Sequence, residues 1–145
     1  MKKLMLAAAG AVVMSSFGGI AYAQDMEAKK RENVTTHAVY MVKLNYNKGA
    51  EFAERVKMQN EIAAALGEPQ AQVHHVMTGP YDRIVVVEMK EGMASLDWEM
   101  TPSDARFQAA MVEKMGSMEA YREWQSKWPE ITERPVVYYT HTHND

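Results

Sequence analysis

The five histidines are the residues best suited to chemistry, and all of them fall in segments with strand-like composition. His37 opens the first of these segments, and His141 and His143 lie in the last. If the last strand runs antiparallel beside the first, its end pairs with the start of the first, which would bring His37 close to His141 and His143. Three imidazoles within reach of one another could bind Zn²⁺, Cu²⁺ or Ni²⁺. A His-x-His pattern at a chain end is a weak signal, so we expect a solvated strand end with no metal.

His74 and His75 are a different case, because adjacent residues of a strand point to opposite faces of the sheet. They cannot bind one ion together. The histidine that faces a pocket could serve as a general base, a haem ligand or a hydrogen-bonding anchor, and both are candidate catalytic residues. The alternative is a hydrogen-bonded histidine on an edge strand. The pattern does not decide which of the two faces a pocket.

Aromatic side chains are the second candidate group. Trp124 and Trp128 are four residues apart and would share one face of a helix. Such a face could form the wall of a pocket for a flat, apolar ligand, or it could simply pack a helix on a sheet. The candidate pocket residues are Tyr40, Trp98, Tyr121, Trp124 and Trp128.

Methionines at positions 111, 115 and 118 repeat at helical spacing together with Phe107. Thioether sulfurs can bind copper(I). Packing of a long helix against a core explains the same stripe, and we favour that interpretation.

Composition excludes several classes of protein. The chain has 145 residues, no cysteine and a formal net charge of −3. Without cysteine there is no disulfide framework, iron–sulfur cluster or thiol nucleophile, and the acidic balance argues against a nucleic-acid partner. The sequence contains no Gly-x-Ser-x-Gly elbow, no phosphate-binding loop, no dinucleotide fingerprint and no His-Glu-x-x-His motif, so it requires no cofactor.

Residues 1–23 have the pattern of a secretory signal peptide. Two lysines precede an apolar run at positions 4–14, and Ala21 and Ala23 form an Ala-x-Ala cleavage site. We expect cleavage after Ala23 and a periplasmic or secreted bacterial protein that has no membrane association once the signal is removed. The alternative is an uncleaved anchor, for which the apolar run is short.

The rest of the chain predicts an α+β domain over residues 37–145, preceded by a flexible lead-in at 24–36. Strands are expected at 37–45, 72–78, 83–89 and 135–143, and a helix at 50–66. A short helix is expected within 91–100, another after an N-cap at Thr101, and a further helical stretch after Gly116 and Ser117. This order is the ferredoxin-like βαββαβ arrangement, with a four-stranded antiparallel sheet and helices on one face. The other face, with Val39, Met41 and Tyr139, has no element to cover it. An uncovered apolar face marks a partner interface, and the simplest partner is a second copy.

The segments VYMVKLN, KGAEFAERVKMQNEIAAALG, HHVMTGPYDRIVVVEMK and YREWQSKWPEITERPVVYYT resemble, in their order and pattern, the dimeric α/β-barrel superfamily, and NIPSNAP-type proteins in particular. The likeness extends over about residues 37–143 and includes no sharp catalytic signature. It implies two ferredoxin-like sheets that meet face to face to close a barrel, with a pocket between each sheet and its helices or inside the barrel. The region 91–117 is longer than the family pattern needs and could cover such a pocket.

The resemblance leaves the activity open, because the superfamily includes cofactor-free monooxygenases, isomerases, haem-handling enzymes and proteins of unknown role. We expect an exported homodimer that binds a small hydrophobic or aromatic molecule. The alternative is an enzyme of the same superfamily, and a weaker alternative is periplasmic metal binding.

Overall fold

The computed structural model describes residues 32–144, so the expected signal peptide at 1–23 lies outside the described residues. Nine elements follow one another within these described residues. They are β1 (Val34–Val42), α1 (Gly49–Ala65), β2 (Gln72–His75), β3 (Arg83–Met89), the 3₁₀ helix η1 (Gly92–Asp97), α2 (Pro102–Met115), α3 (Met118–Ser126), α4 (Trp128–Ile131) and β4 (Val136–His143).

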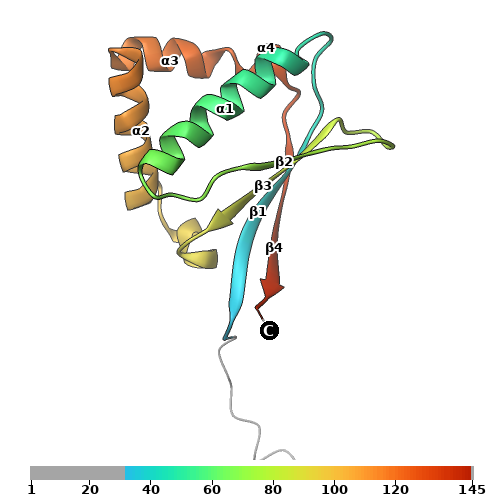
Figure 1. Ribbon diagram of the computed structural model, residues 1–145, viewed down its shortest axis with the longest axis vertical. Helices are drawn as coiled ribbons and strands as arrows, with labels where there is room; N and C mark the ends of the chain where they lie inside the picture. The colour runs from blue at the N-terminus through green and yellow to red at the C-terminus, as the bar shows by residue number, and fades with distance from the viewer. Residues whose placement is uncertain (1–31, 145) are drawn as a thin grey trace, which may run out of the picture. The chain divides into compact units, whose positions relative to one another are not determined.

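The four strands form one open antiparallel sheet in the order β2-β3-β1-β4. Figure 1 shows the helices gathered on one side of this sheet. The protein is therefore an α+β protein whose sheet is compatible with the ferredoxin-like fold, as the order of the predicted elements indicated. β3, the strand with the most continuous apolar run, lies inside the sheet between β2 and β1.

The strand register decides which side chains face the helices. Ala38 of β1 lies opposite Tyr139 of β4, whereas Val39 lies opposite Tyr138. Residues directly opposite in antiparallel strands share a face, so Tyr139 points to the helix side together with Ala38. The expectation that Tyr139 lies on the uncovered face is wrong, and Tyr138 takes that place. The error arises because a strand's faces alternate every residue, so a shift of one residue exchanges them.

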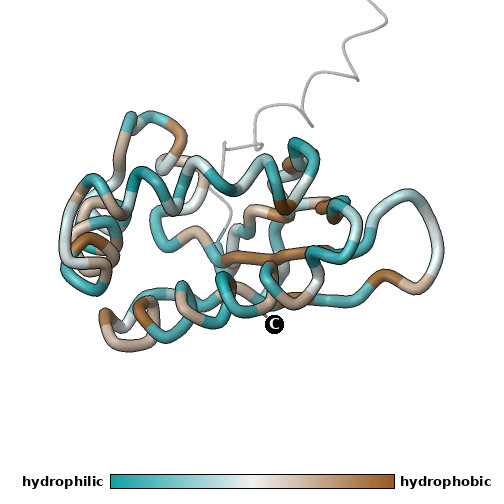
Figure 2. Tube along the Cα trace, turned by 90° about the horizontal axis from the view of Figure 1, so that it is seen from above, coloured by the Kyte–Doolittle hydropathy of each residue, from teal (hydrophilic) through white to brown (hydrophobic). Residues whose placement is uncertain are grey.

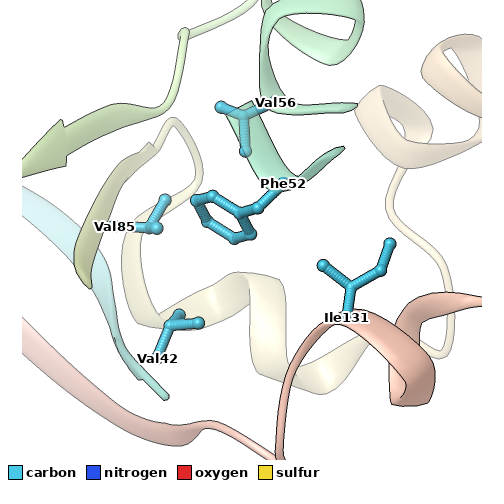
Figure 3. Packing of buried hydrophobic residues seen from close by; sticks show 5 residues of the cluster. All are labelled: Val42, Phe52, Val56, Val85 and Ile131. Carbon is cyan, nitrogen blue, oxygen red and sulfur yellow. The ribbon is translucent and has the colours of Figure 1, made fainter. Parts of the chain in front are cut away.

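The hydrophobic core lies between the sheet and the helices. Figure 3 shows the ring of Phe52, from α1, at the centre of this cluster. Phe52 meets Trp128 edge to face, with ring centroids 6.1 Å apart, and Ile131 of α4 is fully buried beside it. The cluster of buried residues is Val42, Phe52, Val56, Val85 and Ile131. Truncating a ring such as Phe52 to alanine typically costs about 3–5 kcal/mol.

β1 and β2 differ most from the expected bounds. β1 begins at Val34, so the last residues of the predicted lead-in belong to the sheet. β2 ends at His75 rather than at residue 78, and the turn that follows contains Gly79 with a φ of +108°. The last helical region divides at Gly116 and Ser117, as the sequence predicts. Gly116, with a φ of +86°, ends α2, and Ser117 then caps α3 by accepting a hydrogen bond from the backbone N–H of Ala120.

The hydropathy of the residues matches the arrangement of a sheet with helices on one side. Figure 2 shows a brown, hydrophobic strand segment at the centre, while the helices alternate between teal and brown as amphipathic surface helices do. Within residues 32–144, no helix is both long and apolar enough to cross a membrane.

Candidate functional site

A cavity of about 400 Å³ lies between the helix side of the sheet and the elements α1, η1 and α2. Its volume is in the range of small-molecule pockets. The sheet contributes Tyr40 and Val87 near its centre and Tyr139 from β4, and α2 contributes Phe107. The apolar lining residues include Ala38, Ala63, Pro69, Ala71, Val87, Leu96 and Phe107, and the polar ones include Tyr40, Gln59, Ser95, Thr101, Ser103, Asp104 and Tyr139.

Tyr40 is a group in this cavity whose acidity the protein changes. Burial raises the pKa of the Tyr40 phenol above its ordinary value of 10.0, and the nearby Tyr139 and the Asp104 carboxylate raise it further. The phenol therefore stays protonated at neutral pH and keeps an O–H donor. A protonated phenol at the wall of a cavity can donate one hydrogen bond to a ligand and accept another.

Asp104 is held in place by the start of α2. Its carboxylate accepts hydrogen bonds from the backbone N–H of Thr101 at 3.2 Å and from the Thr101 hydroxyl at 2.7 Å. The Thr101 side chain in turn accepts the backbone N–H of Asp104 at 3.0 Å. This is a reciprocal capping box, and it confirms Thr101 as the predicted N-cap. The cap fixes one negative charge at the rim of the cavity.

Glu68 forms the charged wall of the cavity. Its side chain is only 5% exposed, and its carboxylate pairs with Lys90 at 2.9 Å and Arg106 at 2.5 Å. The hydrogen bonds from Lys90, Arg106 and Ser103, in that order, lower the pKa of Glu68 from 4.5 to about 2. Lys90 also donates to the carbonyl of Gly67 at 2.8 Å. Glu68 therefore joins the end of α1 to α2 and to the segment after β3.

The structure separates His74 and His75 as predicted. His74 lies opposite Ile84, and His75 lies opposite Arg83, so the two point to different faces of the sheet. Both are exposed. His75 is on the helix side, where it lines a second hollow beside α1, and neither histidine is among the described residues that line the Tyr40 cavity. The histidine beside a polar partner in an enclosed pocket, which would favour an enzyme, does not occur there.

The three histidines considered for a metal site do not come together. The end of β4 pairs with the start of β1, as expected, and His141 and His143 share a face with ring centroids 5.1 Å apart. His37, however, lies opposite Thr140 and Glu88, which places it on the other face of the sheet. The described residues contain no group of three or more histidine, aspartate or glutamate side chains that could hold a metal ion.

Most of the aromatic residues expected in a pocket lie elsewhere. Of the five, only Tyr40 lines the 400 Å³ cavity. Trp98 follows η1 and is 55% exposed. Trp124 contacts the rings of Tyr121 and Trp128 at centroid distances of 6.4 and 5.7 Å, so these three gather in one cluster between α1, α3 and α4.

Trp124 and Trp128 of this aromatic cluster pack against Arg55 of α1. Its guanidinium carbon lies 4.7 Å from the centroid of the Trp124 ring and 5.3 Å from that of Trp128, and only 7% of the residue is exposed. The tryptophans therefore cover a buried cation by cation–π contact. Of the methionine stripe, Met111 is fully buried, whereas Met118 is 39% exposed.

The sequence-based search missed Tyr139, Asp104 and Glu68 as cavity residues. In the sequence only the N-cap Thr101, three residues before Asp104, was recognised, and Tyr139 was placed on the wrong face of the sheet. Strand register supplies the missing signal for Tyr139, because it places that ring on the same face as Tyr40. Glu68 carries no local signal, since its partners Lys90 and Arg106 are distant in the sequence.

No protein-family model, curated protein or solved structure matches this chain. The chain's own geometry is therefore the basis for inferring a function.

Proposed function

We propose that this protein binds a small, largely apolar or aromatic molecule in the cavity between its sheet and its helices. The observation that carries the proposal is the 400 Å³ cavity in which apolar walls meet the phenols of Tyr40 and Tyr139. Ligand pockets commonly combine a mostly apolar lining with a few placed polar groups, and this cavity does so.

The polar groups indicate what kind of ligand fits. Tyr40 stays protonated, so it can donate to an oxygen or nitrogen of the ligand. The rings of Tyr40, Phe107 and Tyr139 offer faces and edges against which a flat molecule can pack. A neutral aromatic ligand with one hydroxyl or carbonyl group satisfies both kinds of contact.

A homodimer is the second part of the proposal. The face of the sheet away from the helices carries a band of aliphatic and aromatic side chains, and no described element covers it. The band consists of Val39, Met41, Ile84, Val86, Val136 and Tyr138. An identical band on a second copy is a matching apolar surface, and two sheets packed through it give the barrel that a NIPSNAP-type protein of the dimeric α/β-barrel superfamily would form.

Export is the third part, and it depends on the sequence of residues 1–23. If the signal peptide is removed after Ala23, the mature chain begins at Gln24 and is periplasmic or secreted. Native mass spectrometry of protein purified from its own periplasm would measure the mature mass, the dimer and any retained small molecule together. A mass that includes Met1 would contradict export with cleavage.

A binding experiment with 2-naphthol as the probe tests the pocket itself. This compound is flat, neutral and aromatic and carries one hydroxyl. We expect the wild type to bind it and the Tyr40→Phe variant to bind it about three- to tenfold more weakly, because one hydrogen bond is worth about 0.5–1.5 kcal/mol. Tyr46→Phe is the matched control, since Tyr46 is 91% exposed and lies outside the cavity lining.

Two results would overturn the pocket assignment. One is equal weakening of 2-naphthol binding by Tyr40→Phe and Tyr46→Phe. The other is the absence of any bound molecule, both in native mass spectra and in titrations with 2-naphthol up to its solubility limit.

A further inference from the structure

The outer edge of β2 has backbone groups that face away from the sheet. β2 is an edge strand and pairs only with β3 among the described strands. The backbone N–H of Val76 donates to the carbonyl of Asp82 at 3.1 Å. Bonded positions alternate along an antiparallel pair, so His74 bonds toward β3, while the N–H and C=O groups of Val73 and His75 point outward.

The side chain of Asn60, from α1, already bonds to the first outward-facing backbone groups of this edge, those of Ala71. Its side-chain amide donates to the carbonyl of Ala71 at 2.9 Å and accepts from the N–H of Ala71 at 2.8 Å. Ala71 is two residues before Val73 and therefore has the same outward orientation. The Asn60 amide makes the pair of hydrogen bonds that a neighbouring strand would make, and the same edge continues at Val73 and His75.

A groove of about 570 Å³ lies beside these two residues, between β2 and α1. In Figure 1, α1 runs above β2 in the view. Where α1 passes Val73, the side chains that line the groove are small or apolar, and they include Ala53, Val56 and Ala64. A backbone placed along the groove would therefore lie against small and aliphatic side chains.

One end of the groove is cationic. His75 and Arg83 lie opposite each other across β2 and β3, and both line the groove together with Lys57 of α1. One acidic residue, Glu61, also lines it, at 4.0 Å from Lys57 and 3.5 Å from Lys114. The end near His75 and Arg83 thus offers positive charge to an incoming carboxylate.

We propose that this groove binds an extended peptide segment of another protein, which adds to β2 as a further strand. The backbone of the segment bonds to the outward groups of Val73 and His75, and its alternate side chains pack on α1. A carboxylate, from an acidic side chain or a chain end, lies near Arg83 and His75. Strand addition to a sheet edge beside a helix is a recurrent way to recognise peptides, and this groove is separate from the Tyr40 cavity.

A peptide fits the groove better than an anionic amphiphile such as a fatty acid. An alkyl chain would match the apolar walls, and its carboxylate would match Arg83. The alkyl chain, however, has no donors or acceptors for the outward backbone groups of Val73 and His75. The backbone of an added peptide strand forms hydrogen bonds with these groups. Both ligands can be compared in one experiment.

The probe is the hexapeptide acetyl-TVTVTD with a free C-terminus, together with pools in which its two valine positions are varied. We expect titration of the ¹⁵N-labelled protein with these peptides to shift the amide resonances of Val73 and His75 more than the others. A second peptide, with N-methyl groups on the amides of one edge, lacks the donors on that edge. Of the two such peptides, one for each edge, we expect one to bind at least tenfold more weakly than the parent.

Val73→Pro is the matching change in the protein, and Val73→Ala is its control. Proline removes the outward N–H, and edge strands tolerate proline where the N–H faces outward. We expect Val73→Pro to weaken peptide binding at least tenfold and Val73→Ala to keep it within about threefold. The N-methylated peptides test the same hydrogen bonds in the wild-type protein, so the test stands if the proline variant does not fold.

Three results would overturn the proposal. The first is that neither acetyl-TVTVTD nor any pool shifts the resonances of Val73 and His75 at 1 mM. The second is that peptides bind but neither backbone N-methylation nor Val73→Pro weakens them. The third is that decanoate, used as the fatty-acid probe, shifts these resonances at lower concentration than every peptide.

Discussion

The guanidinium of Arg55 lies over the ring of Trp124 at 4.7 Å and donates a hydrogen bond to the backbone carbonyl of the same residue at 2.8 Å. The centroid of the Trp128 ring lies 5.3 Å from the same guanidinium carbon, and a carboxylate oxygen of Glu51 lies 3.5 Å from the guanidinium. A buried cation is costly unless it is paired, and here two rings, a carbonyl and a carboxylate pair with it. This cluster fixes α3 and α4 on α1.

Replacing Arg55 by lysine should destabilise the protein. Lysine keeps the charge but loses the planar stack and the bond to the Trp124 carbonyl, which together should lower the free energy of unfolding by about 1–3 kcal/mol. Urea unfolding followed by circular dichroism measures this. Arg122→Lys on α3 is the control, because Arg122 is exposed. Equal stability of the two variants would contradict a structural role for the Arg55 cluster.

The ion pairs of Glu68 should make the protein more sensitive to acid. The pKa of Glu68 is about 2 in the folded protein and is taken as the ordinary 4.5 in the unfolded chain. A lowered folded-state pKa stabilises the protein above pH 4.5, and this contribution is lost as the pH falls from 4.5 towards 2. We expect Glu68→Gln to lower the unfolding free energy at pH 6 by about 1–3 kcal/mol.

The difference between the wild type and Glu68→Gln should shrink as the pH is lowered from 4.5 to 2, which urea unfolding at several pH values measures. Glu61→Gln is the matched control. Glu61 also pairs with two lysines, but its side chain is 53% exposed, so we expect a loss of no more than about 0.5 kcal/mol. A stability difference for Glu68→Gln that is independent of pH would show that its ion pairs are not the cause.

Removal of the N-cap at Thr101 should loosen the start of α2. The Thr101→Ala variant loses both hydrogen bonds of the Thr101 hydroxyl, to the Asp104 carboxylate and from the Asp104 backbone N–H, and loss of an N-cap typically costs about 1 kcal/mol. Thr101→Ser keeps the hydroxyl and should recover most of that loss. Thermal unfolding compares the two variants. If serine is as destabilising as alanine, the packing of the buried threonine methyl group is more important than the cap.

Residues whose signals are local could be assigned from the sequence. The capping box at Thr101 lies within four residues, and the alternation of His74 and His75 follows from strand geometry alone. The end of α1 was also predicted to within one residue: α1 ends at Ala65, and Gly67 has the φ of +65° that a glycine after a helix commonly adopts.

Residues whose environment depends on distant segments could not be assigned in the same way. Tyr139 required the register of β4 against β1, in which a shift of one residue exchanges the two faces. Trp124 and Trp128 were recognised as sharing one face of a helix, but nothing near them in the sequence indicates that Arg55 occupies that face. Most of the cavity wall, for the same reason, could be found only once α1, α2 and the sheet were placed together.

The proposed dimer can be tested at Met41 on the uncovered sheet face. Met41 lies there, opposite Ile84 on one side and Val136 on the other. In a dimer that buries this face, Met41→Lys would place a charge in an apolar interface, where an unpaired charge is strongly unfavourable. We therefore expect light scattering at about 10 μM, in the micromolar range of many protein associations, to give a dimer mass for the wild type and a monomer mass for the variant.

Met77→Lys is the control, since Met77 is 96% exposed in the turn between β2 and β3 and its replacement should leave the dimer intact. Met41 lies on the face of the sheet away from the helices and is not part of the core cluster, so the Met41→Lys monomer should keep its circular dichroism spectrum. A wild-type monomer, or a Met41→Lys variant that stays dimeric, would contradict association through this face.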